Sequence, residues 1–287
     1  MRERPYAPPA YGQHFLHDKN ILALIVRAAD LVPEDEVLEI GAGTGRLTEM
    51  ALAKGVKVTA VEVDAGLHPQ LEEKFAGNSS LRLIKGDVLR LPWRDLLPPD
   101  GRAVVLGNLP YAISTQIIFK VLENRDRVRR AVFLVQWEVA VRMAADPGGK
   151  EFGILSVACQ LFGKPEIVRK VPPTVFLPPP RVDSALVRWD VLEDALYTVP
   201  DRIFTMSVVK AGFGQRRKKL VNSLAAGFPS MGKDAIGQIL SEMGLSASVR
   251  AEQLSVEEFA DLATRMDDIV GKGLSEEEKR RNNHDSS

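Results

Sequence analysis

The sequence predicts an α/β fold with a parallel, Rossmann-like sheet, followed by a small helical domain. Short apolar runs alternate with helical patterns along the first two thirds of the chain. A glycine-rich turn joins the first of these runs to its helix, and from about residue 197 only helical patterns remain. Since 45% of the 287 residues are hydrophobic, the chain can build cores for one large and one small domain.

The first unit of the sheet is a buried strand at 36–40, a glycine-rich turn at 41–45 and a helical pattern at 47–53. The glycine spacing is G-x-G-x-G rather than the G-x-G-x-x-G of dinucleotide binders, because position 46 is Arg. Glycines let the backbone adopt positive φ and pass close to a ligand. A neutral loop without a phosphate-gripping lysine favours a cofactor that lacks a diphosphate.

Acidic residues follow the next two predicted strands. The strand 57–61 leads into Glu62, about twenty residues past the loop, where an acid commonly accepts bonds from ribose hydroxyls. The strand 81–85 leads into Asp87, which can accept from the amino group of an adenine ring. Each acid alone can equally be an ordinary strand-end or helix-capping carboxylate. Because parallel strands end at one edge of the sheet, the loop and both acids should meet there.

A fourth strand, 102–106, delivers Asn108-Leu109-Pro110-Tyr111 to the same edge. The N6 lone pair of adenine is delocalised into the ring, so methylation of this nitrogen requires acceptors for both of its N–H groups. The Asn108 side-chain oxygen and the Leu109 carbonyl, held by Pro110, supply two acceptors. Tyr111 adds a flat face for stacking. The alternative interpretation of the tetrapeptide alone is a turn after a strand.

The remaining elements complete the predicted architecture. A stiff loop at Pro178-Pro179-Pro180 precedes the last strand, 184–189. Helical patterns then follow at 201–210, 215–225, 233–243 and 256–266. We therefore expect a Rossmann-like domain over 1–192, a helical domain over 193–270 and a disordered polar tail over 271–287.

The charge balance restricts how this chain can contact nucleic acid. With 38 basic and 38 acidic side chains the formal net charge is zero, so any such contact must use local patches. Two candidates are the arginines at 125, 127, 129 and 130, and the basic run 216–219, which we expect to open the second helix of the helical domain. Either set can instead be a solvated face.

Other residue types narrow the class of protein. The single cysteine, Cys159, excludes an internal disulfide framework, and the four histidines form no metal constellation, so we expect no metal site. No run approaches the roughly 18 apolar residues of a membrane span, and no apolar signal region follows the N-terminus. We expect a cytoplasmic monomer with no membrane partner.

Seven motifs occur in a fixed order along the chain. They are Tyr11-Gly12-Gln13-His14-Phe15-Leu16, Glu39-Ile40-Gly41-Ala42-Gly43-Thr44-Gly45, Val61-Glu62-Val63-Asp64, Gly86-Asp87, Gly107-Asn108-Leu109-Pro110-Tyr111-Ala112-Ile113-Ser114-Thr115, Phe176-Leu177-Pro178-Pro179-Pro180-Arg181-Val182-Asp183-Ser184 and Phe213-Gly214-Gln215-Arg216-Arg217-Lys218. Together they closely resemble the KsgA/RsmA family of small-subunit rRNA adenine N6,N6-dimethyltransferases, from about residue 11 to residue 263.

The resemblance implies a class I methyltransferase fold, S-adenosyl-L-methionine as methyl donor, and two adjacent adenosines in the 3′-terminal hairpin of small-subunit rRNA as target, in immature 30S particles. It implies catalytic positions at Asn108, Leu109, Pro110, Tyr111 and Phe176, with Phe176 beside the target base. It implies cofactor contacts from Gln13, His14, Leu16, Gly41, Gly43, Gly45, Glu62, Val63, Asp87, Val88 and Asn108. Two residues depart from the family pattern: His14 stands where Asn is frequent, and Ala112 replaces the usual Asn after Tyr111.

The implied reaction is a direct in-line methyl transfer to a base that is single-stranded or flipped out of a helix. Three alternatives stay open. The first is a relative that methylates large-subunit rRNA and confers antibiotic resistance, although the segment 213–224 favours the small-subunit family. The second is a non-catalytic small-subunit assembly factor, against which the intact Asn108, Pro110 and Tyr111 argue. The third is a small-molecule methyltransferase, which explains the basic run poorly.

Overall fold

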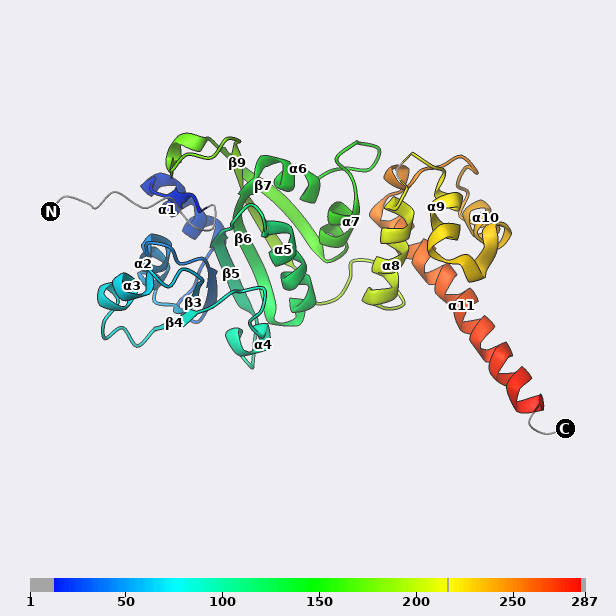
Figure 1. The fold of residues 1–287 in the computed structure, drawn as a ribbon, viewed down its shortest axis with the longest axis horizontal. Coiled ribbons are helices and arrows are strands. Elements are labelled where there is room, and N and C mark those ends of the chain that lie inside the picture. The colour runs from blue at the N-terminus through cyan, green and yellow to red at the C-terminus, as the bar shows by residue number, and fades with distance from the viewer. Residues whose placement is uncertain (1–12, 216, 285–287) are drawn as a thin grey trace. The chain divides into compact units, whose positions relative to one another are not determined.

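The computed structural model describes residues 13–215 and 217–284, and side chains only as far as residue 270 (Figure 1). The chain divides into two compact units. Unit 1 contains the residues up to Ala144 together with Phe162–Asp194, and unit 2 contains Ala145–Leu161 together with the residues from Ala195 onward. Tyr11, Gly12, Arg216 and the end of the predicted tail, 285–287, lie outside the described residues.

Unit 1 is built on a seven-stranded sheet with the strand order β4-β3-β2-β5-β6-β9-β7 (Figure 1). The strands are β2 (Glu36–Ile40), β3 (Lys57–Glu62), β4 (Leu81–Lys85), β5 (Ala103–Asn108), β6 (Val128–Gln136), β7 (Gly163–Val171) and β9 (Ser184–Val191). The pairs from β4 to β6 are parallel, whereas β9 pairs antiparallel with both β6 and β7. The predicted α/β fold with a mostly parallel sheet is confirmed. The order reverses between β2 and β5, and open α/β sheets bind ligands at such a reversal.

Helices cover both faces of this sheet. On one face α1 (Lys19–Ala29), α2 (Arg46–Leu52) and α3 (His68–Lys74) pack on alternate strand residues such as Val104, Leu106 and Val132. Asp18 caps α1 by accepting from the N–H groups of Asn20 and Ile21. The remaining helices of unit 1 are α4 (Trp93–Leu96), α5 (Ser114–Glu123) and α6 (Trp137–Met143), and both α5 and α6 contact β6.

A two-stranded antiparallel ribbon joins the start of the described chain to the proline-rich loop. It consists of β1 (Phe15–Leu16) and β8 (Phe176–Leu177). Leu16 lies opposite Phe176, and both side chains are buried in the core of unit 1. Phe15 lies opposite Leu177 on the other face of the ribbon. The sequence did not predict this ribbon, since each strand has only two residues.

Unit 2 is helical, with α7 (Ile154–Leu161), α8 (Arg202–Phe213), α9 (Leu220–Gly227), α10 (Gly232–Glu242) and α11 (Val256–His284). The Phe213 ring stacks on Phe259 with centroids 5.5 Å apart and meets Phe152 edge-on at 6.1 Å. Residues 145–161, assigned by prediction to the first domain, group with these helices. The helix α11 extends to His284, so it includes 271–284 of the tail that we expected to be disordered. None of the described helices is long and apolar enough to cross a membrane.

Candidate active site

A cavity of about 340 Å³ opens at the carboxyl ends of β2, β3, β4 and β5. Most of the predicted site residues line it, namely Gln13, His14, Gly41, Gly43, Glu62, Val63, Asp87, Val88, Asn108, Leu109, Pro110 and Tyr111. The volume falls in the range of small-molecule sites. The juxtaposition of the glycine loop, the two acids and the Asn108 loop therefore follows from the sheet topology.

The glycine loop forms one wall of this cavity. Gly43 has a φ of 55°, and a Cβ added there would lie 3.4 Å from the Phe15 ring. Backbone in this left-handed region, facing an aromatic ring at that distance, favours glycine. The loop therefore presents bare backbone to a ligand.

Glu62 is a buried hydrogen-bond acceptor in the wall of the cavity, with an exposed fraction of 2%. Its Oε2 accepts from the Gly43 N–H at 2.7 Å, and its Oε1 accepts from the Asp64 N–H at 2.9 Å and from the Gln13 side chain at 3.4 Å. A carboxylate has about four lone-pair sites, so room remains for about one further donor. The longest bond, from Gln13, is the one that a ligand hydroxyl would most easily replace.

Asp87 stands at the end of β4 with one oxygen engaged locally. Its Oδ1 accepts from the Leu89 N–H at 2.9 Å, and its Oδ2 lies 3.5 Å from Nε of the exposed Arg90 side chain. The bond to Leu89 fixes the carboxylate at the cavity wall. Val88 and Leu89 add apolar surface beside it.

Asn108 is held by the N-terminal segment. Its Nδ2 donates to the His14 carbonyl at 2.7 Å, which directs Oδ1 away from that partner as an acceptor. The Tyr111 hydroxyl hydrogen-bonds with Ser184 Oγ at 2.7 Å, and burial raises the pKa of Tyr111 above its ordinary value, so the hydroxyl stays protonated at neutral pH.

His14 connects the parts of this site. Its ring centroid lies 5.4 Å from that of Tyr111, and its Nδ1 donates to the Pro178 carbonyl at 2.7 Å. The side chain of His14 therefore contacts both the Asn108–Tyr111 loop and the proline-rich loop. Its backbone carbonyl holds Asn108 at the same time.

Three predicted residues do not line the main cavity. Leu16 borders a smaller adjoining hollow of about 50 Å³. Gly45 has a φ of 70°, and a Cβ there would lie 2.7 Å from the Phe75 ring, so helix packing requires the glycine. Phe176 is 2% exposed and belongs to the core with Leu16, and its implied place beside the target base stays a prediction.

The sequence reasoning missed several cavity residues, which are Phe15, Ile40, Val61, Gly86, Leu89, Ala112 and Ile113. Each lies within two positions of a predicted residue, so the motifs pointed to the right segments. Phe15 was missed because the pairing of β1 with β8 decides which side of that segment faces the cavity.

Glu39 is a further buried acid at this edge, 1% exposed in the wall of the smaller hollow. Burial, with a smaller contribution from the nearby Glu62 carboxylate, raises the pKa of Glu39 to about 8. Within the described residues, Oε2 of Glu39 has no hydrogen-bond partner. Among the residues that the structure describes, no group of three or more histidine, cysteine or acidic side chains could hold a metal ion.

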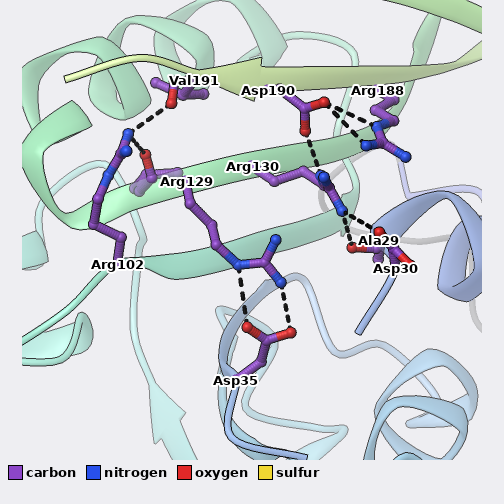
Figure 2. A network of polar contacts seen from close by, with 10 residues as sticks. Ala29, Asp30, Asp35, Arg102, Arg129, Arg130, Arg188, Asp190 and Val191 are labelled. Carbon is purple, nitrogen blue, oxygen red and sulfur yellow. Dashed lines mark hydrogen bonds and ion pairs between the residues drawn. The ribbon is translucent and has the colours of Figure 1, made fainter. Parts of the chain in front are cut away.

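Two arginines of the first candidate RNA patch belong to a network of polar contacts within unit 1 (Figure 2). Arg129 binds both oxygens of Asp35, at 3.1 and 2.5 Å. Arg130 contacts Asp190, the Ala29 carbonyl and Asp30, and its side chain is only 11% exposed. Arg129 and Arg130 therefore bind groups of unit 1, and contact of these arginines with RNA stays a prediction.

Arg125 and Arg127 follow the same pattern. Arg125 donates through Nε to the Glu193 carbonyl at 2.7 Å, and Arg127 donates to the Arg94 carbonyl at 3.2 Å. Four arginines in six residues therefore fasten the start of β6 to its surroundings.

The second candidate patch lies in unit 2. The basic run does not open a helix as predicted: Arg217 and Lys218 lie in the turn before α9, which begins at Leu220. Lys218 lines a shallow hollow with Gln215, Asn222, Ala225, Ala226 and Lys233, and none of these residues is acidic.

Comparison with known proteins adds independent findings. Residues 7–268 match the family described as "Ribosomal RNA adenine dimethylase". A protein of Pelotomaculum thermopropionicum named "Ribosomal RNA small subunit methyltransferase A" is 41% identical over 95% of this chain and 96% of its own length. A protein of the same name from Syntrophotalea carbinolica is 42% identical over 92% of this chain and 97% of its own length.

Two solved structures share the fold. A dimethyladenosine transferase from Plasmodium falciparum is 26% identical with a TM-score of 0.77, over 87% of this chain and 96% of its own. The 23S rRNA methyltransferase ErmE is also 26% identical, with a TM-score of 0.68, over 88% of this chain and 99% of its own.

Proposed function

The chain belongs to the ribosomal RNA adenine dimethylase family, and from this premise we propose that its targets are two adjacent adenosines in the 3′-terminal hairpin of small-subunit rRNA. The enzyme is an S-adenosylmethionine-dependent rRNA adenine dimethyltransferase of the small-subunit type, as its relatives' names state for them. The observation that carries the proposal is Asn108, held by the His14 carbonyl in the wall of the cavity with Tyr111 beside it.

The cavity fits the cofactor that this family uses. The donor needs acceptors for ribose hydroxyls and for an adenine amino group, and Glu62 and Asp87 supply carboxylate oxygens at successive strand ends. Gly41 and Gly43 would pass along its methionine and ribose portion, and Val63 and Val88 would contact its apolar surface. When bound, S-adenosylmethionine supplies an electrophilic methyl group.

The Asn108 loop performs the chemistry at the target base. Asn108 Oδ1 and the Leu109 carbonyl accept hydrogen bonds from the N6 amine, which concentrates its lone pair on nitrogen and stabilises the positive charge that develops there. Tyr111, fixed by Ser184, offers its ring to the face of the base. These groups preorganise one geometry, so positioning and electrostatics carry the rate.

Unit 2 would hold the rRNA through its phosphates. The turn at 217–219 offers cations, and the hollow that Lys218 lines offers further cations and amides with no acidic side chain in its lining. The partner that we propose is rRNA within immature 30S particles, bound by a cytoplasmic monomer. The zero net charge favours a local contact of this kind over general binding to polyanions.

A comparison of substrates tests this function. The enzyme would be incubated with labelled donor and with naked small-subunit rRNA, immature small subunits, mature unmethylated small subunits or large-subunit rRNA. We expect the highest kcat/KM for immature small subunits. Preferential methylation of large-subunit rRNA would favour the activity named for ErmE, and binding to immature subunits without any methyl transfer would leave an assembly role alone.

A further inference from the structure

An exposed apolar surface borders the catalytic loop. Leu177 is 58% exposed and Val182 is 45% exposed, and Pro178 and Pro179 between them are exposed as well. We call residues 177–182 the apolar ledge. Large apolar side chains so exposed on a rigid loop mark a binding surface when they adjoin a site.

The orientation of the ledge follows from strand pairing. Leu177 lies directly opposite Phe15 in the β1–β8 ribbon, and directly opposite residues share one face of a ribbon. Phe15 lines the cavity, whereas the residues on the other face, Leu16 and Phe176, are buried in the core. The Leu177 side chain therefore projects on the side of the ribbon that carries the cavity.

Both ends of the ledge are fastened to the base site. The Pro178 carbonyl accepts from His14 Nδ1 at 2.7 Å, and His14 in turn packs on Tyr111. Ser184, two residues after Val182, hydrogen-bonds with the Tyr111 hydroxyl. Asp183 lies between Val182 and Ser184. Its backbone carbonyl accepts from the Trp137 N–H at 3.0 Å, and its side-chain carboxylate pairs with Lys170 at 2.8 Å. The ledge is thus held in register with the ring that we propose stacks on the target adenine.

We infer that the apolar ledge, and Leu177 above all, binds the base of the nucleotide that adjoins the target adenosine. This inference rests on the proposed function. A base that enters the cavity leaves its neighbour without its stacking partner, so the neighbour's face loses apolar contact. Leucine and proline side chains commonly supply such contact to unstacked bases. The exposed Arg181 of the ledge would suit the phosphate between the two nucleotides.

The ledge gives the second of two adjacent adenosines a surface to bind. While one adenosine of the proposed adjacent pair occupies the cavity, the base of the other lies on Leu177.

The test is a double-mutant cycle across the interface. Leu177→Ser would be assayed on unmethylated small subunits reconstituted with rRNA that carries either the intact neighbour or an abasic residue beside the target. We expect Leu177→Ser to lower kcat/KM for the intact substrate about tenfold, and the abasic residue to lower the wild-type value to a similar extent. The two changes together should also cost about tenfold, because each removes the same contact.

Controls separate the ledge from general damage. Val32→Ser changes a valine with a similar exposed fraction, 48%. Val32 precedes the first residue of β2, whereas the cavity opens at the carboxyl end of that strand, so this variant should keep the wild-type kcat/KM for both substrates. Leu177→Met should retain wild-type rates, and donor affinity measured by calorimetry should not move in either Leu177 variant. Independent, multiplying losses of about a hundredfold in total, or no loss in Leu177→Ser, would overturn the inference. Absence of methyl transfer by the wild type on the intact substrate would refute the proposed function, and the ledge with it.

Discussion

Replacing Asn108 with alanine separates two contributions of one side chain. Its Nδ2 donates to the His14 carbonyl at 2.7 Å, and its Oδ1 is the proposed acceptor for the target amine. The first bond holds the N-terminal segment over the cavity, and the second acts during the chemical step. Alanine removes both, but they affect different measurable quantities.

The structure sets the size of each effect. A neutral hydrogen bond contributes about 0.5–1.5 kcal/mol net, so loss of the His14 contact should weaken donor binding by about two- to tenfold. Loss of one preorganised electrostatic contact to the transition state typically lowers kcat by about 10²–10³. We therefore expect Asn108→Ala to nearly abolish turnover while it largely spares cofactor affinity.

Calorimetry of donor binding and single-turnover methylation measure the two effects separately. Asn124→Ala is a matched control, because the buried Asn124 also donates through Nδ2 to a backbone carbonyl, that of Lys120 at 2.9 Å, at the end of α5. This control should lose stability but keep its rate per folded molecule. If Asn108→Ala lost donor affinity while its residual turnover matched the wild type, the assigned role would be wrong.

Three further predictions concern glycine, pH and charge. Gly45→Ala should lower the free energy of unfolding, measured in urea, by about 1–3 kcal/mol more than Gly77→Ala does. Both glycines have φ near 70–77°, but only Gly45 has a neighbour, Phe75, within 4 Å of the added Cβ. Equal losses of stability in the two variants would contradict the packing explanation. Glu39 has a folded-state pKa of about 8 against an ordinary 4.5, so between these values the folded state binds a proton that the unfolded state has lost. The free energy of unfolding of the wild type should therefore fall from about pH 5 to about pH 8 relative to that of Glu39→Gln. A difference between the two proteins that stays constant across this pH range would contradict the prediction. Reversing the charges of Arg216 and Arg217 should weaken small-subunit binding and reduce its salt slope by about one per lost phosphate contact, and an unchanged slope would leave both residues as structural.

Much of the sheet was predictable because its strands are marked by glycine and acidic residues at their carboxyl ends as well as by apolar runs. The strands that end at Ile40 and Lys85 lead into glycine, and β3 itself ends in the acid Glu62, so these residues marked the carboxyl ends of the strands and their common edge. β6 was missed because Arg129 and Arg130 suggest a surface segment. In the fold, Asp35 and Asp190 neutralise those arginines, and only long-range pairing brings these partners together.

The site was predictable at the level of motifs and less so at the level of side-chain direction. Glu62 and Asp87 reach the cavity because a parallel sheet places them there. Phe176 belongs to the core because β8 pairs with β1, and a two-residue strand leaves no periodic signal. The start of α9 at Leu220 depended on the balance between helix propensity and four adjacent cations, which composition alone does not resolve.

The most direct test of the proposed function is methyl transfer from labelled S-adenosylmethionine to small subunits that lack the modification, followed by mass spectrometry of the recovered nucleosides. We expect N6,N6-dimethyladenosine at two adjacent positions of the 3′-terminal hairpin. Label at any other position, or no transfer despite measured donor binding, would contradict it.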